Sequence, residues 1–96
     1  MLSAVKNYLK ITWDDEDAAL QTIIDRGKAY LDDLTGAELD FESDGPARSL
    51  LLDYCRYVYN NASEYFEENF ATELLRLQLQ MGVKDHGSAE ESGPPG

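Results

Sequence analysis

Residues 46–60 read PARSLLLDYCRYVYN, and this stretch decides the fold because it is apolar around most of a helical circumference. At the helical period its polar side chains share one narrow side, and its apolar side chains cover more than half of the circle. A surface helix needs only one apolar stripe. The pattern therefore predicts a central helix, which Pro46 can begin after the turn at Asp44-Gly45.

The residues before this stretch predict two further helices. Leu2, Val5 and Leu9 recur at three- and four-residue steps, which indicates a short helix that ends near Ile11. A longer helix is expected from the acidic run at residues 14–17, where an Asp can cap its N-terminus, to Thr35-Gly36, where Gly suits a left-handed C-terminal residue. Its apolar stripe comprises Leu20, Ile23, Ile24, Gly27, Leu31 and Leu34.

A short connection and a last helix complete the expected fold. Residues 37–43 alternate apolar and acidic side chains, which predicts an extended segment such as an edge strand. Ser63 is a candidate N-cap for a helix from Glu64 to Met81, and Gly82 is expected to end it. This helix carries a main apolar ridge of Phe66, Phe70, Leu74, Leu77 and Met81, and on its opposite side a second ridge of Tyr65, Leu75 and Leu79.

Length and composition favour one domain followed by a tail. A chain of 96 residues supports a single modest core. We predict an all-α fold, a small four-helix bundle at residues 1–81, and a flexible acidic tail rich in Gly and Pro at residues 82–96.

The charge balance excludes several classes of partner. The net charge is -11 and only eight Lys and Arg are scattered along the chain, so direct binding to nucleic-acid phosphates or to an anionic membrane is not expected. No apolar run approaches the roughly 20 residues of a membrane span, and no signal-peptide pattern is present, so we expect an intracellular protein. A single cysteine, Cys55, leaves no internal disulfide.

Catalytic and metal sites are not predicted. His86 has no Cys or second His nearby, and the apolar neighbours of Cys55 should raise its pKa and make the thiol inert. The acidic run at residues 14–17 does not fit a calcium loop, which needs Gly at its sixth position and Glu at its twelfth, where this chain has Ala19 and Asp25. We therefore expect no enzyme, no cofactor and no metal, with weak cation binding by the run as the alternative.

Two surfaces are candidates for interaction. Large aromatic and apolar groups beyond the needs of a small core usually mark interfaces, and the candidates are Trp13, Tyr57, Tyr59, Tyr65, Leu75 and Leu79. Residues 14–44 hold eleven acids against two basic residues, so one face should be strongly negative. The candidates for that face are Asp14, Asp15, Glu16, Asp17, Asp25, Asp32 and Asp33.

Three segments together resemble the head-tail connector proteins of tailed bacteriophages. They are VKNYLKI at residues 5–11 followed by DDED at residues 14–17, the helix end at Thr35-Gly36, and the helix at residues 50–60 with YVYN near its end. The resemblance covers residues 2–81. It implies a virion protein at the head-tail interface, assembled in the host cytoplasm, that forms a dodecameric homo-oligomeric ring beneath the portal protein.

The resemblance also implies how the ring would act. Genomic DNA would pass through without specific binding, and the negative face would line that conduit. A tail-completion or stopper protein would dock on the ring. The resemblance assigns no residue to these contacts, and the Gly- and Pro-rich terminus departs from the family pattern; Val83, Lys84 and His86 in the expected tail are our own candidates for contact with the portal. No membrane contact is implied.

One alternative of another class remains open. An acidic face can also mimic DNA and occupy the basic site of a nucleic-acid enzyme or another basic partner. A mimic predicts tight, salt-sensitive binding to that partner, whereas a connector predicts assembly beyond a dimer.

Overall fold

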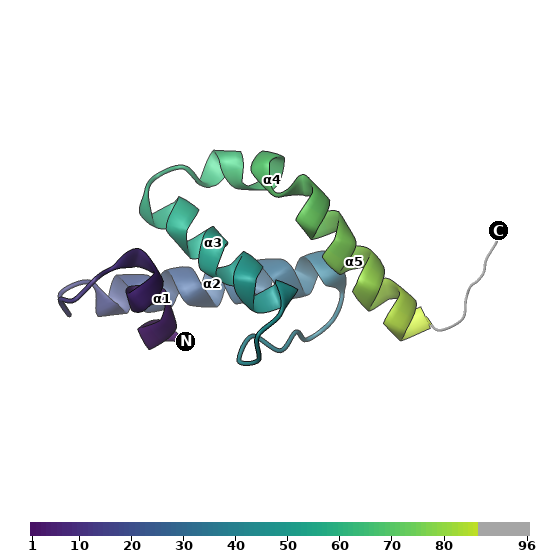
Figure 1. The fold of residues 1–96 in the computed structure, drawn as a ribbon, viewed down its shortest axis with the longest axis horizontal. Coiled ribbons are helices and arrows are strands. Elements are labelled where there is room, and N and C mark those ends of the chain that lie inside the picture. Colours follow the sequence, from purple (N-terminus) through teal and green to yellow (C-terminus); the bar gives the residue numbers. More distant parts are fainter. Residues whose placement is uncertain (87–96) are drawn as a thin grey trace.

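Every regular element of the protein is helical in residues 1–86, the part of the chain that the computed structural model describes (Figure 1). The prediction of an all-α fold is confirmed. The elements are α1 (Leu2–Leu9), α2 (Asp17–Thr35), α3 (Pro46–Tyr59), the 3-10 helix η1 (Ser63–Tyr65), α4 (Phe66–Asn69) and α5 (Ala71–His86).

Helix α3 is the central helix, as its sequence predicts. It packs against α1, α2, η1 and α5, and Figure 1 shows it crossing α2 with α4 and α5 arching over it. Pro46 occupies the first turn, where its missing N–H costs no hydrogen bond. The helix buries four residues of the core: Ala47, Leu50, Leu51 and Cys55.

Gly27 of α2 packs directly against side chains of α3. A Cβ atom at this position would lie 2.6 Å from Cδ1 of Leu51 and 2.7 Å from Cδ2 of Tyr54. Gly27 belongs to the predicted apolar stripe, of which Leu20, Ile24 and Leu31 are also buried. The absence of a side chain at Gly27 thus leaves room for Leu51 and Tyr54 of α3 in a closely packed core.

Helices α1 and α2 both end at a residue in the left-handed backbone conformation. Lys10 ends α1 with φ 61°, and the chain then turns so that Ile11 is buried and its N–H donates to the Lys6 carbonyl at 2.8 Å. Gly36 ends α2 with φ 69°, as predicted. A glycine adopts this conformation without the steric cost that other residues incur.

The connection between α2 and α3 is a loop, so the prediction of an edge strand is wrong. No strand forms in the described residues. In this connection, side chains instead of a neighbouring strand form hydrogen bonds with backbone N–H and C=O groups. The Asp32 carboxylate accepts a hydrogen bond from the N–H of Leu39 at 3.0 Å. The Arg48 guanidinium donates to the carbonyl of Phe41 at 3.2 Å, and the Phe41 ring is buried.

The last helix differs from its prediction at both ends and in the middle. Ser63 is not an N-cap, since η1 begins after Ala62 without a side-chain cap. The helix is interrupted at Phe70, which has φ -115°, so α4 and α5 replace the single expected helix. The described part of the chain therefore has five α-helices. The Phe66 and Phe70 rings stack with their centroids 5.0 Å apart, and both meet the Tyr57 ring edge-on.

Gly82 does not end the last helix, because α5 continues to His86. A helix tolerates an internal glycine at a cost of about 1 kcal/mol relative to alanine. Val83, Lys84 and His86 therefore belong to the last helix. The rest of the predicted tail, residues 87–96, lies outside the described residues.

The molecule is elongated. Its principal extents are 52, 24 and 18 Å, and its radius of gyration is 15.2 Å, whereas a compact domain of this length has about 12 Å. Figure 1 shows the reason, since the C-terminal part of α5 projects beyond the other helices. Among the described helices none combines the length and apolarity required to cross a bilayer.

Candidate functional site

The described surface carries open grooves. One open groove is lined by Leu39, Pro46, Leu77 and Met81 together with acidic loop residues. Among the residues whose side chains the structure describes, 1–82, no three His, Cys, Asp or Glu side chains are grouped as metal ligands. The candidate site is therefore a set of surfaces, which the following contacts define.

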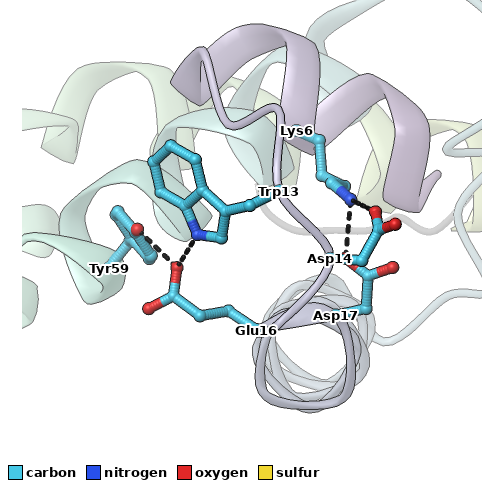
Figure 2. Close-up of polar contacts among 6 residues, drawn as sticks. All are labelled: Lys6, Trp13, Asp14, Glu16, Asp17 and Tyr59. Atoms are coloured by element: carbon cyan, nitrogen blue, oxygen red, sulfur yellow. Dashed lines mark hydrogen bonds and ion pairs between the residues drawn. The ribbon is translucent and has the colours of Figure 1, made fainter.

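Lys6 ties helix α1 to the start of α2. Its Nζ lies 2.7 Å from Oδ1 of Asp14 and 2.7 Å from Oδ1 of Asp17, as Figure 2 shows. These hydrogen bonds raise the pKa of Lys6 and lower the pKa of Asp14. The acidic run therefore fixes the N-terminal helix, and it supplies no side-chain cap to α2, whose N-cap residue is Glu16.

Glu16 holds an exposed indole in place. Its Oε1 accepts hydrogen bonds from Nε1 of Trp13 at 2.9 Å and from the Tyr59 hydroxyl at 2.8 Å (Figure 2). The bond from Trp13, and next the bond from Tyr59, lower the pKa of Glu16. Trp13 nevertheless stays 47% exposed. The result is a large aromatic surface that is already oriented before any partner arrives.

The seven acids predicted to form one negative face have different surroundings. The three acids just described have partners within the chain. Asp25 accepts a hydrogen bond from Gln21 at 3.0 Å, and Asp32 is half-buried against the loop that follows α2. The side chains of Asp15 and Asp33 are exposed and make no hydrogen bond or ion pair with residues 1–82, the part of the chain whose side chains the structure describes. The role of these acids in a conduit stays a prediction.

Asp53, on the polar side of α3, contacts α1, and sequence reasoning missed this contact. The Tyr8 hydroxyl donates to Oδ1 of Asp53, which raises the pKa of Tyr8. Arg56 lies 3.2 Å from the same carboxylate, and its guanidinium carbon is 4.9 Å from the centroid of the Tyr57 ring. The narrow width of the polar side was the one available signal, because a narrow polar stripe can be covered by a single short helix.

The six predicted interface residues fall into two groups. Tyr57 and Tyr59 are half-buried in the chain's own packing, where Tyr57 accepts a hydrogen bond from Nδ2 of Asn69 at 2.9 Å and Tyr59 binds Glu16. The other four are exposed: Trp13 at 47%, Tyr65 at 53%, Leu75 at 54% and Leu79 at 58%.

Helix α5 presents an uncharged outer face. Ala71 and Thr72 share this face with Leu75 and Leu79, and all four are exposed. Arg76 lies at its edge. On the other side of the helix the main ridge packs into the core as predicted, with Leu74 and Leu77 buried.

These features define a class: a small, acidic, all-helical protein that exposes an apolar face on its last helix. The chain belongs to the phage gp6-like head-tail connector proteins, whose family model matches residues 1–88. The protein is thus a structural component of the bacteriophage virion, an adaptor between head and tail. No curated protein and no solved structure matches the chain.

Proposed function

We propose that this connector assembles as a closed ring beneath the portal protein, with twelve copies as the family resemblance implies. The observation that carries the proposal is the outer face of α5, where Leu75 and Leu79 stay more than half exposed although the opposite ridge is buried. An apolar face on an otherwise strongly acidic surface is typical of an interface. The family membership supports the same conclusion.

The ring would conduct DNA without gripping it. Asp25 and Asp33 lie on the exposed side of α2, away from the buried stripe. Repeated around a ring, such carboxylates give the wall a negative potential that repels DNA phosphates. The net charge of -11 supports this arrangement.

The two ends of the ring would bind different partners. Val83, Lys84 and His86 belong to the part of α5 that projects from the body, which suits contact with the portal (Figure 1). A tail-completion or stopper protein would then dock on the opposite end. Assembly would take place in the host cytoplasm and end at the head-tail interface.

Native mass spectrometry across a concentration series tests the ring. We expect wild type to form an oligomer beyond a dimer, and the double variant Leu75→Glu, Leu79→Glu to stay monomeric. Ala29→Glu is the matched control, because residue 29 is exposed on α2 and also gains a negative charge. A wild-type chain that remains monomeric at high concentration would overturn the proposal.

The DNA-mimic alternative has weaker support. Asp14, Glu16 and Asp17 bind partners within the chain, so fewer acids are free to imitate phosphates. Tight binding to a basic protein that weakens steeply with salt would nevertheless favour this alternative over the ring.

A further inference from the structure

Trp13 has the properties of a preformed anchor. Its indole N–H is bound by Glu16, and that carboxylate is held in turn by Tyr59, so the ring is oriented while nearly half of it faces solvent (Figure 2). Aromatic anchors of this kind dominate interface energies, and an oriented side chain loses little entropy on binding. Asp15, two residues further along the chain, is exposed and makes no hydrogen bond or ion pair within the described residues. We call Trp13 and Asp15 the Trp13 knob.

A second surface has complementary properties. Leu75 and Leu79 form an aliphatic strip on α5, and Arg76 beside them is exposed and makes no ion pair in the described part of the chain. We call these three residues the α5 face. Most of the protein surface would repel another copy of so acidic a chain, whereas this face offers apolar area and one positive charge.

The two surfaces lie far apart on one chain. The loop that carries Trp13 is at one end of the long axis, and α5 projects at the other end (Figure 1). Two different patches at opposite ends cannot satisfy each other within one copy. Between copies they produce a heterologous contact, which generates a ring when the rotation closes.

We infer that the Trp13 knob of one copy docks on the α5 face of the next, an inference that rests on the proposed ring. The indole packs on Leu75 and Leu79, and the Asp15 carboxylate pairs with Arg76. Each copy then contacts two neighbours through different surfaces. Complementary charge fixes the register, and like charges oppose the contact of two knobs or of two α5 faces.

A charge exchange tests the pairing of Asp15 with Arg76. We expect Asp15→Arg alone and Arg76→Asp alone to weaken assembly by about tenfold or more, because each places like charges together. The double variant should recover most of the wild-type assembly. As a matched control, Asp25→Arg and Arg26→Asp exchange two exposed neighbours on α2 and should leave the oligomer unchanged.

Trp13 supplies a direct readout, because it is the only tryptophan in the chain. With increasing concentration, wild-type fluorescence should shift to shorter wavelength and become less accessible to acrylamide. Leu79→Glu should abolish the shift, while its circular dichroism stays that of the folded chain.

The outcomes separate the two proposals. A wild-type ring whose Trp13 emission does not change with assembly, or a charge exchange that fails to restore assembly, overturns this contact and leaves the ring in place. A wild-type chain that never assembles overturns both.

Discussion

Replacing Gly27 by alanine should destabilise the protein, although alanine is the better helix former. The new Cβ would lie 2.6 Å from Cδ1 of Leu51 and 2.7 Å from Cδ2 of Tyr54. Neither neighbour can yield easily. Leu51 is fully buried, and the Tyr54 ring stacks on Tyr30 at 5.6 Å and meets Phe66 edge-on at 5.5 Å.

The magnitude follows from two opposing effects. Overpacking in a filled core costs about 1–3 kcal/mol, and two simultaneous contacts with constrained side chains place this site near the upper value. The intrinsic preference of alanine for a helix returns about 1 kcal/mol. We therefore expect Gly27→Ala to lower the free energy of unfolding by about 2 kcal/mol, which corresponds to a fall in Tm of roughly 10 °C.

Thermal unfolding followed by circular dichroism measures this effect, at one low concentration because assembly adds stability of its own. Gly82→Ala is the control. It lies inside α5 with nothing within 4 Å of its Cβ position, so it should raise the free energy of unfolding by up to about 1 kcal/mol. If Gly27→Ala also raised Tm, the close packing of α2 on α3 would be refuted. If Gly82→Ala lowered it, α5 would not continue through Gly82.

Three further predictions concern the core, the N-terminal junction and the thiol. Leu74→Ala should cost about 2–4 kcal/mol in urea unfolding because Leu74 is buried, whereas Leu75→Ala should leave the monomer's stability nearly unchanged; equal effects would contradict the assignment of α5's two sides. Glu16→Gln should destabilise the chain at pH 7. Because the pKa of Glu16 is lowered in the fold, its carboxylate stabilises the fold above pH 4.5 and loses this effect as pH falls through the folded-state pKa. If the difference in free energy of unfolding between variant and wild type stayed constant down to about pH 3, this reasoning would be contradicted. Burial raises the pKa of the Cys55 thiol to about 11, so the free energy of unfolding should decline as pH rises from 9 to 11. Iodoacetamide at about pH 8 should modify Cys55 only after unfolding. Rapid labelling of the native protein would show that the thiol is exposed.

Helical periodicity predicted most of the fold because its determinants are local. The three apolar stripes of α1, α2 and α3, the glycine that ends α2 and the proline that begins α3 all follow from spacing and backbone preference. The break at Phe70 was not predictable in this way. It depends on the aromatic packing of Phe66 and Phe70 against Tyr57, which joins segments separated along the chain.

The exposure of the candidate surface residues could be predicted only in part, for a similar reason. The second ridge could be found from its position opposite the main ridge, and its residues are exposed. Tyr57 and Tyr59 are large aromatic residues like the exposed Tyr65, but their side chains contact other parts of the same chain. The acidic run indicated a helix cap, yet Lys6 and Tyr59 bind its carboxylates from other helices. Partners distant in sequence decided each difference.

Electron microscopy of the purified chain mixed with the portal protein of its phage would show directly whether this chain is a connector that works as a ring. The expected result is a closed ring stacked coaxially on the portal, with α5 of each copy at a subunit boundary. If free monomers were seen beside unoccupied portals even at high protein concentration, the claim that this chain works as a ring would be contradicted.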